Sequence, residues 1–132
     1  GIPLTHRHGA SSVTFVTGHE TSEKQEKSVN WRQLALSSNS LVIYMGIRNI
    51  EYIVEELIIG GMKRDTKCAV IQEATLKNQK SLITELPELP EVIKTNNIKP
   101  PAIVIIGRIV DFQVKNTITK LSAVNLPKIK KI

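Results

Sequence analysis

The sequence predicts an α/β fold in which a mixed sheet of roughly five strands is flanked by helices. Two observations carry this prediction. Short apolar runs alternate along the chain with segments whose apolar residues recur at helical spacing. The chain also has 132 residues, of which 41% are hydrophobic and many are Ile, Val or Leu, enough to bury one core. Because strands and helices alternate, a largely parallel or mixed sheet covered on both faces is expected.

The first elements are expected within residues 12–36. Ser12–Thr17 alternates apolar and hydroxyl side chains and stops at Gly18, which predicts a short strand. Residues 19–28 are charged and read as a flexible loop. Asn30 precedes the apolar positions of residues 31–36, so a short helix capped by this side chain is expected.

The next two elements are a buried strand and an amphipathic helix. Residues 41–46 form a continuous apolar run that ends at Gly46, a pattern typical of a strand buried on both faces. Apolar residues then recur at three- and four-residue intervals over residues 50–58. This spacing predicts a helix, which Gly60-Gly61 closes.

The remaining elements are three strands and one helix. Strands are expected at residues 68–73, 81–85 and 102–107, and a helix is expected after Pro87 and Pro90. Pro100-Pro101 stiffens the entry to the last strand. The ordered domain is expected to span residues 1–110, and residues 111–132 read as a poorly patterned basic tail.

Composition narrows the classes of function. The net charge of +6 suits an anionic partner such as a polycarboxylate, although a solvated Lys-rich surface explains it as well. Aromatic residues make up only 4% of the chain and no basic stripe is evident, which disfavours a nucleic-acid-binding domain. No apolar run is long enough to span a membrane. The single Cys68 and the three His show no metal-ligand spacing, so no metal is expected.

Strand ends are the positions most informative about function, because ligands of open α/β sheets collect there. Three expected strands end in small or sulfur-containing residues, in the sequences Tyr44-Met45-Gly46, Glu73-Ala74-Thr75 and Ile106-Gly107. Small residues let a ligand approach the backbone. The same residues also occur at strand ends for packing reasons alone, so both interpretations stay open.

Two basic side chains flank the first expected strand. Arg7 precedes it in Gly-Ile-Pro-Leu-Thr-His-Arg, and His19 follows it in Val-Thr-Gly-His-Glu. A guanidinium is well suited to orient a carboxylate-rich ligand. A surface ion pair for Arg7 and a polar strand end for His19 are the alternatives. His6 and His8 have no assigned role.

Several motifs, in order along the chain, resemble those of the uroporphyrinogen-III C-methyltransferases in the tetrapyrrole methylase family. They are GIPLTHR, VTGHE, LVIYMG, a helix ending in GGM, AVIQEAT and PPAIVIIG. In that family these motifs belong to the carboxyl-terminal half of the enzyme. The resemblance therefore implies a tetrapyrrole methylase C-terminal domain, with the Gly-rich loop of the first half having no counterpart among these residues.

The resemblance assigns roles to residues at the strand ends. It implies that Met45 and Ala74, with their neighbours Tyr44 and Thr75, bind S-adenosylmethionine. It also implies that Arg7 and His19 contact the carboxylates of uroporphyrinogen III. No residue is assigned as a catalytic base, and Ala74 stands where relatives often have Gly.

The implied reaction is C-methylation of uroporphyrinogen III to precorrin-2, on the route to siroheme and cobalamin. The resemblance also implies a homodimer in the full-length enzyme, with no nucleic-acid or membrane partner, in the cytoplasm or a plastid. The isolated chain is expected to be inactive, since half of the cofactor cleft is missing from it. A non-catalytic remnant, half of a split protein and a related corrin-pathway methyltransferase remain the alternatives.

Overall fold

The computed structural model describes residues 1–19 and 29–114. Most of the expected loop, residues 20–28, and residues 115–132 of the expected tail lie outside the described residues. Of the remaining tail positions, Phe112 packs its ring on His6, with ring centroids 3.9 Å apart. The backbone N–H of Val114 donates to the carbonyl oxygen of Gly1 at 2.8 Å. The described part of the chain therefore brings its first and last residues together.

The described strands form one five-stranded sheet in the order β1-β2-β5-β3-β4. Their bounds are β1 Thr14–Thr17, β2 Leu41–Tyr44, β3 Lys67–Gln72, β4 Lys80–Glu85 and β5 Ala102–Ile106. Each overlaps a run in which the sequence predicts a strand. The mixed α/β sheet is thus confirmed.

The direction of the strands decides between the two expected types of sheet. Only β1 and β2 pair in parallel among the described strands, whereas β5 pairs antiparallel with both β2 and β3, and β3 pairs antiparallel with β4. Of the two expected arrangements, a largely parallel or a mixed sheet, the described strands therefore form the mixed one. The strands β2 and β3 run in the same direction on either side of the crossover helix α2, as an alternation of strands and helices predicts. The strand β5 is inserted between them and runs against both.

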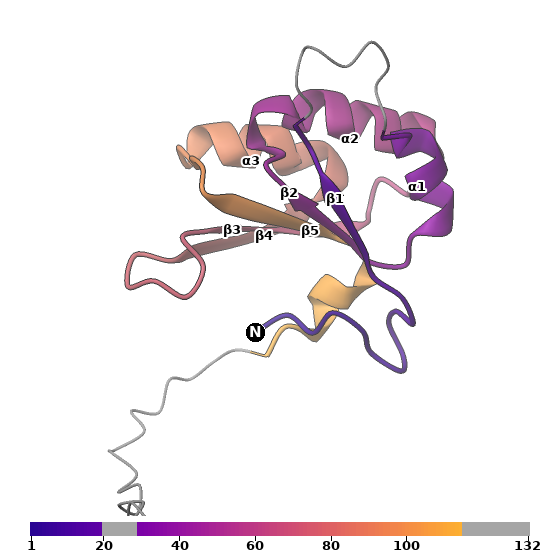
Figure 1. Cartoon of the computed structure of the whole chain (residues 1–132), viewed down its shortest axis with the longest axis horizontal. Coiled ribbons are helices and arrows are strands. Elements are labelled where there is room, and N and C mark those ends of the chain that lie inside the picture. Colours follow the sequence, from indigo (N-terminus) through magenta and orange to yellow (C-terminus); the bar gives the residue numbers. More distant parts are fainter. Residues whose placement is uncertain (20–28, 115–132) are drawn as a thin grey trace, which may run out of the picture.

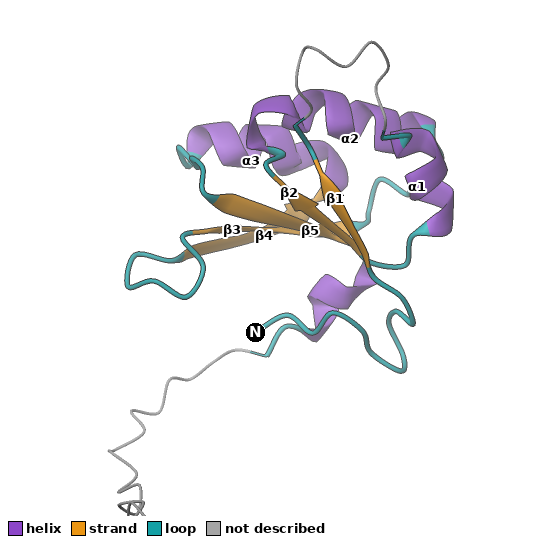
Figure 2. Cartoon of the chain, in the orientation of Figure 1, coloured by secondary structure: helices purple, strands orange, loops and turns teal. Residues whose placement is uncertain are grey.

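The helices lie in a layer on one face of the sheet (Figures 1 and 2). They are α1 Trp31–Ser37, α2 Ile50–Ile59 and α3 Leu89–Thr95. The described residues also form three short 3₁₀ helices, η1 Ile47–Asn49, η2 Leu86–Glu88 and η3 Arg108–Phe112. Within the described residues the other face carries no layer of α-helices, so the expected cover of both faces is not found there; the segment before β1 and η3 lie below this face in Figure 1. No helix within residues 1–19 and 29–114 has the length and apolar character needed to cross a bilayer.

Two apolar clusters follow from the alternation of side chains along each strand. On the helix side, Leu41, Ile43 and Val104 pack with residues of α2 such as Ile53 and Leu57. On the other side, a smaller cluster joins strand residues to η3 and to the segment before β1, and it comprises Ala10, Val42, Ala69, Ile105, Ile109 and Val110. This second cluster covers only part of its face, and the uncovered part contains the candidate site.

Cys68 lies fully buried in the helix-side cluster. Burial raises the pKa of the Cys68 thiol to about 12, because a thiolate is poorly solvated there. We expect no reaction with a disulfide reagent at pH 8 in the folded protein, and fast reaction in denaturant.

The same shift predicts a loss of stability in alkali. The folded state favours the neutral thiol of Cys68, whose pKa is raised to about 12, whereas the unfolded chain releases this proton near pH 8.5. The contribution is complete below about pH 8.5 and declines as the pH rises towards 12. Urea unfolding from pH 7 to 11 measures it, with Cys68→Ala as the control that should show a shallower decline.

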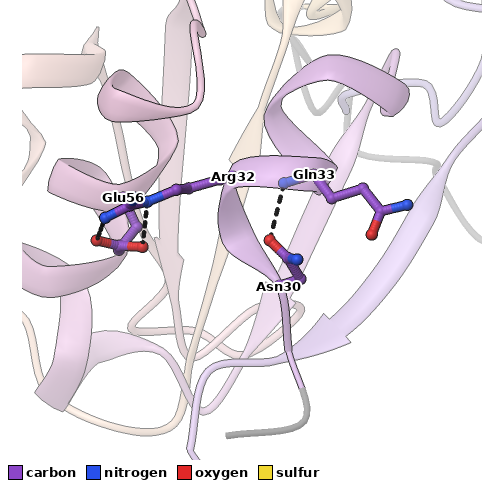
Figure 3. Close-up of polar contacts among 4 residues, drawn as sticks. All are labelled: Asn30, Arg32, Gln33 and Glu56. Carbon is purple, nitrogen blue, oxygen red and sulfur yellow. Dashed lines mark hydrogen bonds and ion pairs between the residues drawn. The ribbon is translucent and has the colours of Figure 1, made fainter.

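Polar contacts define the start of α1 and join it to α2 (Figure 3). The backbone N–H of Gln33 donates to Oδ1 of Asn30 at 3.0 Å, as the sequence predicts for the N-cap. From the same first turn of α1, Nε and Nη2 of Arg32 donate to the two carboxylate oxygens of Glu56, each at 2.9 Å. This two-fold contact holds the short α1 against the longer α2.

We expect Asn30→Ala to lower the free energy of unfolding by about 1 kcal/mol, since the N–H of Gln33 loses its acceptor. Asn30→Asp keeps an acceptor and should change stability far less. Urea unfolding of the three proteins checks the prediction. Equal stability of Asn30→Ala and the parent would contradict the capping role.

Candidate functional site

An apolar cleft of about 600 Å³ lies on the sheet face opposite α1, α2 and α3. It opens where β2 and β3 end and where the antiparallel β5 begins. Its lining residues come from these three strands and their adjoining turns, and they are Tyr44, Met45, Ile47, Ile71, Glu73, Ala74, Leu76, Pro100, Pro101, Ala102 and Ile103. Among them, Glu73 is the only residue with a charged side chain. The size and apolar walls are those of a small-molecule site.

The turns that bound the cleft hold an unusual backbone conformation. Met45, Glu73 and Thr75 have φ values of 53°, 50° and 71°, in the left-handed region that non-glycine residues seldom occupy. Each such residue costs roughly 1 kcal/mol or more relative to ordinary backbone. Concentrating this cost in two turns around one cleft is typical of a functional site.

The turn after β2 is held by the end of β1. The backbone N–H of Gly18 donates to the carbonyl oxygen of Tyr44 at 2.6 Å, and Nδ2 of Asn49 donates to the carbonyl oxygen of Gly18 at 2.7 Å. The segments that follow β1 and β2 come so close that a Cβ on Gly18 would lie 2.4 Å from Cα of Gly46. The position of Met45 is therefore set by contacts on both sides of it.

The turn after β3 is held in a similar way by the start of β5. The N–H of Glu73 donates to the carbonyl oxygen of Pro101 at 3.0 Å, and the N–H of Leu76 donates to the carbonyl oxygen of Glu73 at 3.0 Å. The N–H of Thr75 donates to Oε1 of Gln79 at 2.7 Å. These bonds provide partners for the backbone N–H groups of the turn, and they leave the apolar lining of the cleft uncovered.

The structure brings together three of the four residues expected to bind the cofactor. Tyr44, Met45 and Ala74 line the cleft. Thr75 lies in the same turn as Ala74 but does not line the cleft. The side chains of Tyr44 and Met45 remain 44% and 63% exposed, which is high for apolar groups. An uncovered apolar surface at this point is a surface prepared for a ligand or another part of the polypeptide.

Sequence reasoning missed several lining residues. The Pro100-Pro101 pair reads only as a stiff entry to a strand, and it lines the cleft because β5 runs antiparallel to its neighbours. Because β5 runs antiparallel to β2, Gly107, which follows β5, lies at the opposite end of the strands from Met45. A Cβ there would lie 2.7 Å from the carbonyl oxygen of Asn39, so the glycine is needed for packing.

Arg7 and His19 lie in different places. Exposed Arg7 belongs to the turn between His6 and Ala10, which lies before β1 and packs beside η3. His19 is exposed and follows Gly18. Because β1 and β2 are parallel, it lies at the same end of the strands as Met45. Within the described residues, neither side chain lines the apolar cleft.

No group of three His, Cys, Asp or Glu side chains suited to a metal occurs within residues 1–19 and 29–114. Arg7 instead borders a shallow depression of about 590 Å³ with basic and hydroxyl neighbours, namely Thr5, His6, His8 and Ser11. About half of its lining is polar, whereas the lining of the cleft is almost wholly apolar. The two depressions therefore suit chemically different parts of a ligand, or different ligands.

Comparison with known proteins agrees with this geometry. Residues 1–90 match the family of tetrapyrrole (corrin/porphyrin) methylases. A uroporphyrinogen-III C-methyltransferase of Synechocystis is 41% identical over 111 residues, which cover 84% of this chain and 42% of the relative. A siroheme synthase of Nitrosomonas europaea is 37% identical, over 87% of this chain and 24% of its own length. The chain thus spans less than half the length of these relatives.

A solved structure gives the same result for the fold. Uroporphyrin-III C-methyltransferase from Thermus thermophilus, complexed with S-adenosyl homocysteine, superimposes with a TM-score of 0.70 and 25% identity. The superposition covers 83% of this chain and 48% of that protein. Taken with the match over residues 1–90, these likenesses show that the chain belongs to the tetrapyrrole methylase family.

Proposed function

We propose that this chain supplies the carboxyl-terminal half of a uroporphyrinogen-III C-methyltransferase that uses S-adenosylmethionine. The observation that carries the proposal is the apolar cleft between the ends of β2 and β3, in a chain 41% identical to an enzyme of that name. The domain of residues 1–110 is the proposed unit, and homodimerisation of the whole enzyme is proposed from the family resemblance.

The residues of the cleft fit S-adenosylmethionine. A volume of about 600 Å³ accommodates an adenosyl group, and the walls are almost wholly apolar. Met45 and Ala74 would lie against the cofactor, with Tyr44 beside them and Thr75 supporting the second turn. Ala74 is small enough to allow close approach to the backbone, as the Gly of relatives does. When bound, this cofactor supplies an electrophilic methyl group on a sulfonium.

The task of the chain in this reaction is alignment. The turns at Met45 and Glu73 are braced by the hydrogen bonds of Tyr44 and Pro101 to neighbouring segments. Such bracing holds the walls of the cleft in one geometry, and orientation alone supplies a large part of the rate enhancement in a bimolecular transfer. The apolar walls also exclude water from the reacting carbon.

We assign the substrate carboxylates to Arg7 and His19. Both side chains are exposed, and neither shares the apolar cleft, as expected for groups that meet a large polycarboxylate outside the cofactor pocket. The guanidinium of Arg7 can donate two parallel hydrogen bonds to the two oxygens of a carboxylate through its planar fork. The product would be precorrin-2, and the siroheme route is favoured by the likeness to a siroheme synthase.

Calorimetric titration with S-adenosylmethionine tests the proposal. It is performed on this chain alone and on the chain mixed with the amino-terminal half of the Synechocystis relative. We expect measurable binding only in the mixture, because a second domain is needed to close the open cleft. Methylation of uroporphyrinogen III by the mixture is the second readout.

Absence of binding in both samples, with the circular dichroism of a folded α/β domain, would contradict the proposal. A mixture that binds the cofactor and methylates a later corrin intermediate instead of uroporphyrinogen III would redirect it to another branch of the family. The substrate variant Arg7→Lys, which keeps the charge and loses the fork, should weaken substrate use and leave cofactor affinity unchanged.

A further inference from the structure

We infer that Glu73 makes the cleft prefer the cationic methyl donor over its neutral, demethylated product. The inference rests on the proposed function, since it concerns the cofactor assigned to this cleft. S-adenosylmethionine and S-adenosylhomocysteine have nearly the same shape, and they differ by one methyl group and one positive charge. A cleft that tells them apart by charge therefore needs a charged group close to the bound sulfonium.

Glu73 is the charged group that the cleft offers. It is the one charged residue among those that line it, and it is partly buried there. Lys77, Lys80 and Lys99 lie on the flanking turns and strand, and all three are exposed and outside the lining. Their charges are screened by solvent more strongly than that of a partly buried carboxylate.

The backbone of Glu73 is held in one conformation at the wall of the cleft. Its φ of 50° is strained for a residue with a side chain, and its N–H and carbonyl oxygen are bonded to Pro101 and Leu76. Within the described residues, no side chain donates a hydrogen bond to its carboxylate. Within residues 1–19 and 29–114, the Glu73 carboxylate therefore lies at the wall of an apolar cleft without an ion pair to a Lys or Arg side chain.

The sign of the effect does not depend on the orientation of the ligand, whereas its size falls as the sulfonium and the carboxylate move apart. A carboxylate attracts the sulfonium and has no such interaction with the neutral thioether. The single charge pair therefore raises the affinity for S-adenosylmethionine relative to that for S-adenosylhomocysteine. At a separation of roughly 7 Å and an effective dielectric constant of about 40 to 80, this pair is worth about a three- to sevenfold change in the ratio of dissociation constants. Transfer of the methyl group removes the charge, and release of the product is favoured.

The test compares two ligands on three variants of the mixture of this chain and its complementary half. Glu73→Gln should lower the ratio of the Kd for S-adenosylhomocysteine to the Kd for S-adenosylmethionine by about three- to sevenfold. Glu73→Asp keeps the charge, tolerates the left-handed backbone and should keep most of the ratio. Glu55→Gln makes the same change of net charge on the exposed surface of α2 and should leave the ratio unchanged.

Each outcome decides the inference. A Glu73→Gln protein that loses affinity for both ligands by the same factor has lost a steric contact, and the electrostatic role is overturned. Equal effects of Glu73→Gln and Glu55→Gln would also overturn it, because net charge alone would then be responsible. If the parent mixture binds neither ligand, the proposed function fails together with the inference. If the parent binds both and only the ratio is insensitive to Glu73, the proposed function stands.

Discussion

Replacing Met45 by Asn is expected to weaken S-adenosylmethionine binding by about ten- to a hundredfold. The Met45 side chain is 63% exposed in the open cleft, so a bound ligand would cover a large apolar surface that Asn cannot provide. Burying a Met side chain contributes roughly 1.5–3 kcal/mol, which gives the stated range. Calorimetry on the mixture with the complementary half measures it.

The choice of Asn separates binding from folding. Met45 has a φ of 53°, and Asn is among the residues that adopt this conformation most readily. The thermal unfolding of Met45→Asn should therefore match that of the parent. Met45→Leu keeps an apolar side chain and should bind within a fewfold of the parent. An unchanged affinity in Met45→Asn would remove Met45 from the site.

The second large effect is expected from Gly18→Ala. The added Cβ would lie 2.4 Å from Cα of Gly46 and 3.0 Å from Cδ1 of Ile53. The first contact is with backbone, so relief requires the ends of β1 and β2 to separate. We expect a loss of about 1–3 kcal/mol in the free energy of unfolding, the usual cost of overpacking.

Gly18→Ala should also disturb the cleft, because Gly46 directly follows Met45 and the N–H of Gly18 is bonded to Tyr44. Urea unfolding and cofactor titration measure the two effects. Thr17→Ala is the matched control on the preceding residue, since it changes the same strand end without adding an atom between the segments that follow β1 and β2. Equal stability of Gly18→Ala and the parent would show that the strand ends do not need this close approach.

Much of the local structure could be predicted from the sequence. The helix start at Asn30, the amphipathic α2 and the strands were identified from patterns within a few residues, and each of these has a local physical cause. The same holds for the cleft residues Tyr44, Met45 and Ala74, because a strand end is recognisable from its own residues. Their role as cofactor contacts stays a prediction.

The parts that could not be predicted depend on which strands pair. Pro101 and Glu73 meet because β5 runs antiparallel to β3, and nothing within residues 70–103 specifies that direction locally. The same topology moves Gly107 away from the cleft. Arg7 and His19 are close to one strand in the sequence, yet β1 and the turn before it separate their positions in the fold.

The sequence by itself determined the elements, the α/β class and the strand ends at which a ligand would collect, because periodicity, capping and chain-breaking residues act over a few positions. Only the tertiary structure decided that β5 lies between β2 and β3, that the helices cover one face, and that Glu73 is the charge in the apolar cleft. The physical reason is that strand pairing and burial are contacts between residues far apart in the chain. Their free energies depend on the whole arrangement, and no short segment encodes them.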